Sequence, residues 1–138
     1  MRKIVSAVIL FCGFAGPALA DGHAADGEKV FKKCAACHAV GENAKNKIGP
    51  EQNELLGRTA GGLESFSSKY STAMKAAGDA GLIWTEDTLK EFLASPRTYV
   101  KGTKMAFVGL KTEQEIEDVV AYLATFSPDY VPAEESHK

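Results

Sequence analysis

The sequence predicts an all-α domain with three main helices joined by long loops. Apolar residues recur at helical spacing in segments that begin with capping residues, and no segment shows the alternation typical of a half-buried β-strand. Residues 39–83 are rich in Gly, Asn, Ser and Lys, which favours loops there, with a short helix around residues 70–77. Loops of this length need a large group to pack against.

The first main helix is expected to be capped by Asp26 and to run through Lys32 into residues 34–38. Thr85 is a good N-cap for the second helix, whose apolar stripe precedes Pro96. A capping box at residues 112–115 opens the third helix. The stripes are formed by Leu89, Phe92 and Leu93 in the second helix and by Ile116, Val119, Val120 and Leu123 in the third.

Residues 1–20 are predicted to be a cleavable signal peptide, because a basic start and a short apolar run precede Ala18-Leu19-Ala20. The run is short for a membrane span, although an uncleaved anchor is the alternative. Cleavage would leave residues 21–138 as one periplasmic domain with a flexible tail at 131–138. It would also remove Cys12, one of three cysteines.

The charge balance argues against a nucleic-acid partner. The chain has 16 basic and 18 acidic residues, and loss of Arg2 and Lys3 would leave 14 against 18, a net charge of −4. A generally basic surface is therefore not expected. We expect the domain to act as a monomer.

The segment Cys34-Ala35-Ala36-Cys37-His38 predicts covalent attachment of a c-type haem. Two thiols three residues apart can add to the two vinyl groups of one porphyrin, and His38 follows Cys34 by about one helical turn. A thioredoxin-like pair or a zinc site would be the alternatives. The first lacks its βαβ setting, and the second lacks a nearby fourth ligand.

A second axial ligand would have to approach the iron from the side opposite His38. The candidates are Met74, Met105, His23 and His137. Met74 lies in a predicted helix, where a buried core methionine is the default interpretation. Met105 lies in an irregular segment between two helices, and the residues alone leave the choice open.

The order of several motifs resembles the class I cytochromes c, in particular the small bacterial cytochromes c2. The matching residues are Cys34–His38, Gly49-Pro50, residues 57–61 (Gly-Arg-Thr-Ala-Gly), Trp84 and residues 102–105 (Gly-Thr-Lys-Met). The resemblance covers residues 27–126 and implies one haem c per chain. It implies His38 and Met105 as axial ligands, the Pro50 carbonyl as hydrogen-bond acceptor for His38, and a propionate region formed by Arg58, Tyr70, Trp84 and Thr103.

Three residues depart from the pattern of the resembled family. Gln52 puts an amide where an apolar side chain usually covers the ring, and Glu54 stands where Gly is common. Phe92 replaces a tyrosine whose hydroxyl often approaches the methionine sulfur. These departures bear on the reduction potential and on the strength of the iron–sulfur bond.

The predicted function is a soluble one-electron carrier, not an enzyme. The resemblance implies a cytochrome bc1 complex as donor and a photosynthetic reaction centre or cytochrome oxidase as acceptor. Basic residues near the haem motif and the Met105 segment would face these partners. They are Lys32, Lys33, Lys45, Lys47, Arg97, Lys101, Lys104 and Lys111. The alternatives are a haem peroxidase-like enzyme with a labile distal methionine, a ligand-sensing haem protein and an anchored cytochrome.

Overall fold

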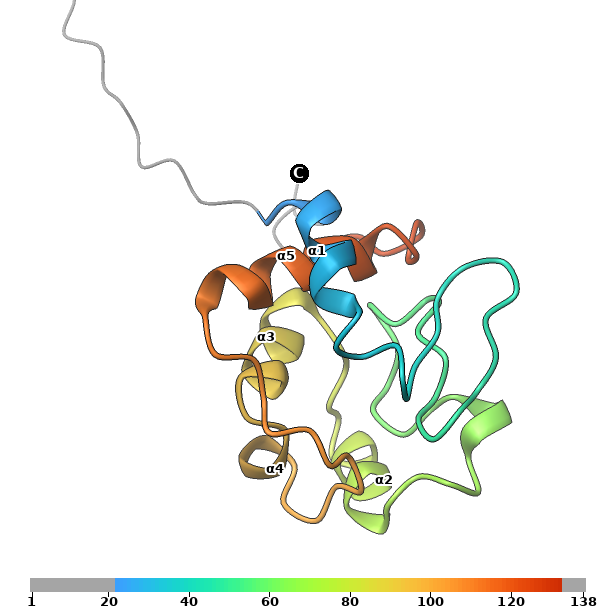
Figure 1. Ribbon diagram of the computed structural model, residues 1–138. Helices are drawn as coiled ribbons and strands as arrows, with labels where there is room; N and C mark the ends of the chain where they lie inside the picture. The colour runs from blue at the N-terminus through green and yellow to red at the C-terminus, as the bar shows by residue number, and fades with distance from the viewer. Residues whose placement is uncertain (1–21, 133–138) are drawn as a thin grey trace, which may run out of the picture.

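The computed structural model describes residues 22–132, which form five α-helices and one 3-10 turn without a regular strand (Figure 1). The elements are α1 (Ala24–Phe31), η1 (Glu64–Phe66), α2 (Thr72–Asp79), α3 (Glu86–Ala94), α4 (Pro96–Tyr99) and α5 (Glu113–Ala124). The predicted signal peptide and residues 133–138 of the predicted tail lie outside the described residues. The all-α prediction is confirmed: α2 corresponds to the short helix expected around residues 70–77, and α4 is an additional short helix.

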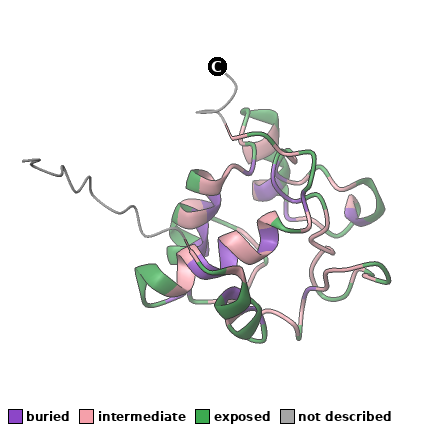
Figure 2. Ribbon diagram, turned by 90° about the horizontal axis from the view of Figure 1, so that it is seen from above, coloured by how far each residue is buried: buried purple, intermediate pink, exposed green. Residues whose placement is uncertain are grey.

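The packing of α1 against α5 joins the two ends of the domain. Gly27 makes the close approach possible, because a Cβ at this position would lie 1.9 Å from the Asp118 carbonyl oxygen. The rings of Phe31 and Tyr122 meet with 5.6 Å between their centroids. Figure 2 shows buried residues on the inner sides of the helices and exposed residues outside. Gly27 and Phe31 therefore pack directly on α5.

The predicted start of α1 is wrong. His23, not Asp26, is the N-cap, and it provides no side-chain cap. Its backbone N–H donates instead to the buried Asp118 carboxylate, with 2.7 Å between nitrogen and Oδ1. Asp26 lies in the first turn and pairs with Lys29. The helix also ends at Phe31, so the cysteine motif lies in the hydrogen-bonded turns that follow it.

The starts of the later helices agree better with the sequence. Thr85 caps α3 and forms a reciprocal box with Thr88. Pro96 follows the end of α3 and opens the short helix α4. Thr112 caps α5 by accepting from the Glu115 backbone N–H, but the return contact of the predicted box is replaced by an ion pair between Glu115 and Lys33.

Long loops join these helices around the space beside α3. Within residues 22–132, the β content is a single antiparallel bridge between Thr59 and Ile83.

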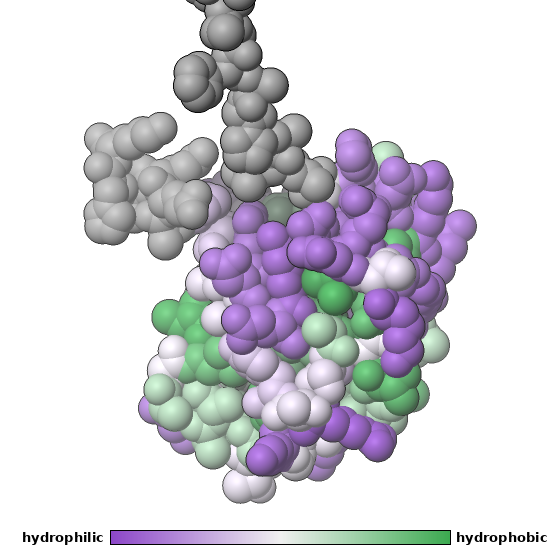
Figure 3. Space-filling model, turned by 90° about the vertical axis from the view of Figure 1, so that its left-hand side faces the viewer, coloured by the Kyte–Doolittle hydropathy of each residue, from purple (hydrophilic) through white to green (hydrophobic). Residues whose placement is uncertain are grey.

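None of the helices in this part of the chain has the length and hydropathy to cross a membrane. Figure 3 shows hydrophilic side chains over much of one side of the molecule, the side on the left in Figure 1, with apolar patches between them.

Candidate functional site

The cysteine motif forms a hydrogen-bonded turn directly after α1. The His38 backbone N–H donates to the Cys34 carbonyl at 2.9 Å, which is the i to i+4 contact of a helical turn. Cys37 donates to the same carbonyl at 3.0 Å. Both cysteines are free and half-buried. Burial raises the pKa of the Cys34 thiol. The turn therefore presents two thiols and an imidazole from one short segment.

His38 is buried and held in one orientation. Its Nδ1 lies 2.7 Å from the Pro50 carbonyl oxygen, and the exposed fraction of the residue is 9%. Gly49 lies against the ring, because a Cβ there would be 2.3 Å from Cε1. Burial lowers the pKa of His38, and the hydrogen bond to Pro50 partly opposes this shift. The neutral ring with its proton on Nδ1 leaves the Nε2 lone pair available for a metal.

A cavity of about 540 Å³ lies beside this turn. Every site residue predicted from the sequence borders it: Cys34, Cys37, His38, Pro50, Arg58, Tyr70, Trp84, Thr103 and Met105. The remaining wall is largely apolar and includes Leu55, Leu89, Phe92, Leu93 and Leu123. Cavities of this size and lining suit a large apolar ligand with a few polar groups. The residues present therefore fit a porphyrin attached at Cys34 and Cys37.

Both candidate methionines border the cavity. Met74 is 8% exposed and belongs to α2, where its backbone N–H donates to the N-cap Ser71. Met105 is half-buried on the irregular segment between α4 and α5, and its backbone N–H donates to the Thr103 hydroxyl at 3.2 Å. Cavity lining alone does not separate the two. His23, the third candidate, is an exposed N-cap of α1, and His137 lies outside the described residues.

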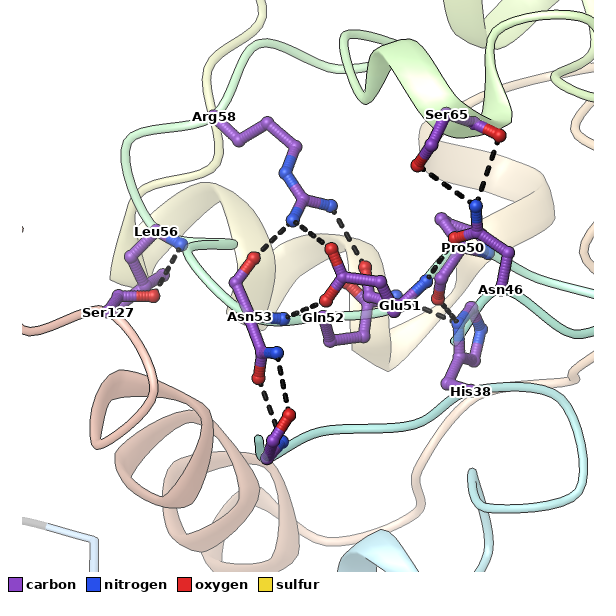
Figure 4. A network of polar contacts seen from close by, with 11 residues as sticks. His38, Asn46, Pro50, Glu51, Gln52, Asn53, Leu56, Arg58, Ser65 and Ser127 are labelled. Atoms are coloured by element: carbon purple, nitrogen blue, oxygen red, sulfur yellow. Dashed lines mark hydrogen bonds and ion pairs between the residues drawn. The ribbon is translucent and has the colours of Figure 1, made fainter. Parts of the chain in front are cut away.

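Arg58 organises the loop that follows Pro50 (Figure 4). Its side chain is 11% exposed and donates to the backbone carbonyls of Glu51 and Asn53. One guanidinium nitrogen also lies 3.8 Å from the Glu51 carboxylate. Burial raises the pKa of the nearby Tyr70 hydroxyl, while the Arg58 charge acts in the opposite direction. Arg58 is thus a largely buried cation rather than a fully exposed surface charge.

An aromatic row forms another wall of the site. Trp84 is 6% exposed and packs on Phe92 with 4.9 Å between ring centroids, and Phe92 in turn contacts Tyr99 at 6.2 Å. Phe92, where the resembled family often has tyrosine, is therefore a buried packing residue. The row links α3 to α4 across one side of the cavity.

The sequence analysis missed part of the lining. Phe66 and Lys69 border the cavity, and the Lys69 ammonium lies 5.8 Å from the centroid of the Phe66 ring. Phe66 also packs edge-on against Tyr70. The available signal was a lone aromatic residue in a polar loop, because such a ring must be buried somewhere.

The predicted basic residues are all exposed, but several have partners. Lys33 forms an ion pair with Glu115. The ammonium groups of Lys47 and Lys104 donate to the carbonyls of Ala35 and Lys69, at 2.7 and 3.2 Å. Lys33 and Lys104 also border the cavity, which places two of these charges at its rim.

The zinc alternative lacks a ligand set, since residues 22–132 contain no group of three or more His, Cys, Asp or Glu side chains able to hold a metal ion. The helical fold, the two thiols and the imidazole at one large apolar cavity together define the class of c-type cytochromes.

Comparison with known proteins identifies the family. Residues 24–127 match the family model for cytochrome c, so the chain belongs to the cytochrome c family. The chain is 56% identical over 108 residues to cytochrome c2 of Afifella marina, covering 78% of this chain and 86% of that protein. It is 43% identical over 129 residues to cytochrome c2 of Blastochloris viridis, covering 94% and 97%.

A solved structure is also similar. The structure of cytochrome c2 from Rhodospirillum centenum superposes with a TM-score of 0.73 at 43% identity, covering 78% of this chain and 100% of that one. The class I cytochrome c fold is therefore established, with covalently attached haem c as its cofactor and electron transfer as its function. The peroxidase-like alternative finds no support among these relatives.

Proposed function

We propose that this chain is a periplasmic one-electron shuttle whose haem is held by Cys34 and Cys37 and ligated by His38 and Met105. The convergence of these residues on one apolar cavity is the observation that carries the proposal. The haem supplies a one-electron ferric/ferrous couple. The chain would contribute two thioether anchors, two axial donors and a largely apolar wall around the ring.

His38 has the clearest role in this arrangement. Its Nδ1–H donates to Pro50 O, and Gly49 closes against the ring. This contact fixes the tautomer in which Nε2 is the metal donor, and it fixes the ring orientation. A rigid ligand minimises rearrangement when one electron arrives or leaves.

The donors near the predicted propionate region would compensate carboxylate charge inside the protein. Buried carboxylates need hydrogen-bond donors or a cation. Tyr70 keeps its hydroxyl proton because burial raises its pKa, and Arg58 brings a buried positive charge close to it. The Trp84 indole N–H and the Thr103 hydroxyl complete the proposed set at the same cavity.

Met105 is the proposed distal ligand, rather than Met74. Met74 is a well-buried member of the hydrophobic core on a regular helix. Met105 belongs to a segment whose Gly-Thr-Lys-Met sequence is shared with the class I cytochromes c. Filling both axial sites with protein donors favours electron transfer over oxygen or peroxide chemistry.

Replacement of each methionine tests this assignment. Met105→Ala should abolish the long-wavelength charge-transfer band that marks methionine sulfur on ferric haem, and should lower the midpoint potential, since thioether ligation favours the ferrous state. Met74→Leu is the matched control and should leave the band intact, at a stability cost of about 1 kcal/mol. Loss of the band in Met74→Leu alone would reverse the assignment. Absence of the charge-transfer band from the wild-type protein at neutral pH would favour the enzyme alternative.

The proposed partners are membrane redox complexes: a cytochrome bc1-type donor, and a photosynthetic reaction centre or cytochrome oxidase as acceptor. The support is the exposure of the predicted basic residues, two of which, Lys33 and Lys104, border the cavity. Redox partners dock through small, weak interfaces, so charge steering governs their association rate. A monomer that docks briefly through this face suits such a role.

A further inference from the structure

The amide of Gln52 lies at the proximal histidine. Its amide nitrogen is 2.8 Å from His38 Nδ1, the same atom that lies 2.7 Å from the Pro50 carbonyl oxygen (Figure 4). Within residues 22–132, Gln52 Oε1 is the buried side-chain polar atom that has no hydrogen-bond partner. Gln52 also borders the cavity. One ring nitrogen therefore has two polar neighbours from the same short segment.

The Pro50 contact decides which atom of Gln52 belongs at His38. A carbonyl oxygen can only accept, so Nδ1 must carry the proton and donate. An amide NH2 group facing that N–H would place two hydrogen-bond donors against each other, with no acceptor between them. A half-turn of the amide exchanges two groups of nearly equal size and places Oε1 at 2.8 Å, where it accepts. It also gives the buried oxygen its missing hydrogen-bond partner.

The opposite tautomer fails on two counts. If Nδ1 accepted from the Gln52 amide, its lone pair would face the Pro50 oxygen at 2.7 Å, which is repulsive. The proton would then be on Nε2, and this nitrogen could not bind iron as a neutral imidazole. Covalent haem in this family requires that donor, so the proton stays on Nδ1 with two acceptors around it.

We propose that Gln52 is a positioning residue that shares the His38 Nδ1 proton with Pro50 and thereby lowers the reduction potential of the haem. The inference rests on the proposed ligation by His38. Each acceptor on Nδ1–H leaves more electron density on the ring, which makes the imidazole a stronger donor. A stronger donor stabilises the ferric state over the ferrous state, and second-shell hydrogen bonds are a known means of tuning potential.

The test compares holoprotein variants in a spectroelectrochemical titration. Gln52→Met keeps the length of the side chain without its amide, and Gln52→Leu is the shorter apolar replacement. Both should raise the midpoint potential, equivalent to about a two- to tenfold shift of the equilibrium toward the ferrous form, as expected for one hydrogen bond. Gln52→Glu retains an acceptor oxygen and should keep the potential at or below the wild-type value. Asn43→Leu, at an exposed position that does not border the cavity, makes a similar amide-to-apolar change and should leave the potential unchanged.

A second measurement separates hydrogen bonding from cavity polarity. In the reduced, diamagnetic protein, the His38 Nδ1–H resonance should move upfield in Gln52→Met, because one acceptor is lost. An unchanged resonance, or an unchanged potential in Gln52→Met, would overturn the proposal even if the Gln52→Leu potential shifted. If only the Gln52 proposal fails, the variants still show the absorption spectrum of His/Met-ligated haem. If the proposed axial ligation fails, the wild-type protein itself lacks that spectrum.

Discussion

Glu54 is the one residue other than glycine with a positive φ in residues 22–132, at 51°. Its backbone N–H donates to the Phe126 carbonyl at 2.8 Å and ties the loop after Pro50 to the chain beyond α5. The turn is therefore kept in the left-handed conformation, although the side chain makes it costly. Glu54 stands where glycine is common in the resembled family, and its positive φ is a conformation that glycine adopts at much lower cost.

Glu54→Gly should stabilise the holoprotein by about 0.5–1 kcal/mol, measured by denaturant unfolding. Glycine removes the Cβ clash at positive φ, and its greater freedom in the unfolded chain offsets part of the gain. Glu54→Ala removes the charge but retains Cβ, so it should give no such gain. Equal stabilisation by both variants would show that charge, not backbone strain, is the cause.

The contact between α1 and α5 shows how a residue distant in sequence can bind a free backbone N–H at a helix end. α1 has no side-chain cap of its own, and its N-terminal His23 N–H is bound by Asp118 from the middle of α5. Gln114 donates to the same carboxylate at 2.8 Å, which helps compensate a charge that is only 6% exposed. A buried carboxylate is tolerated because it has donors on both sides.

Gly27→Ala should destabilise the holoprotein by about 2–3 kcal/mol, because its methyl group would lie within 1.9 Å of the Asp118 carbonyl oxygen and the helices must separate. Thermal unfolding measures the loss. Glu28→Ala, at the adjacent exposed position of α1, should change stability by less than about 0.5 kcal/mol. A similar small effect for Gly27→Ala would mean that the helix contact is loosely packed.

The charges of the molecule are arranged so that α5 partly neutralises the basic rim. Glu115 pairs with Lys33, which borders the cavity, while Glu113 lies exposed in the first turn of α5. The hydrogen bond from Lys33 lowers the pKa of Glu115. A depressed carboxyl pKa means that this pairing is complete above the usual carboxyl range and is lost only as pH falls through the lowered value. At neutral pH, Lys33 is therefore not a free docking charge.

Glu115→Gln should speed electron transfer to a negatively charged membrane complex by releasing Lys33 at the rim. Stopped-flow rates at low ionic strength measure this effect, and Glu113→Gln removes the same charge without freeing a lysine, so its gain should be smaller. Both differences should vanish as salt rises and screening shortens the range of the field. A wild-type rate independent of salt would contradict docking through the basic face.

Most of the helices could be predicted from the sequence, because the signals that define them are local. Thr85 and Thr112 cap their helices as predicted, and the apolar stripes of α3 and α5 face the core. The start of α1 could not be predicted, because the group that binds the His23 backbone N–H is the Asp118 carboxylate, 95 residues away in sequence. The hydrogen bond from His38 to Cys34 agrees with their spacing, since an i to i+4 hydrogen bond depends only on neighbours, although α1 itself ends before the motif.

The sequence by itself identified the attachment motif, its imidazole and the methionine candidates, because these depend only on residue type and on short spacings along the chain. Convergence of the loops decided the rest: the burial of Arg58, the lining by Phe66 and Lys69, and the neutralisation of Lys33 by Glu115. The contact of Gln52 with His38 belongs to the same group. These features depend on distances between segments remote in sequence, and such distances are set only when the apolar stripes and loops close around a common cavity.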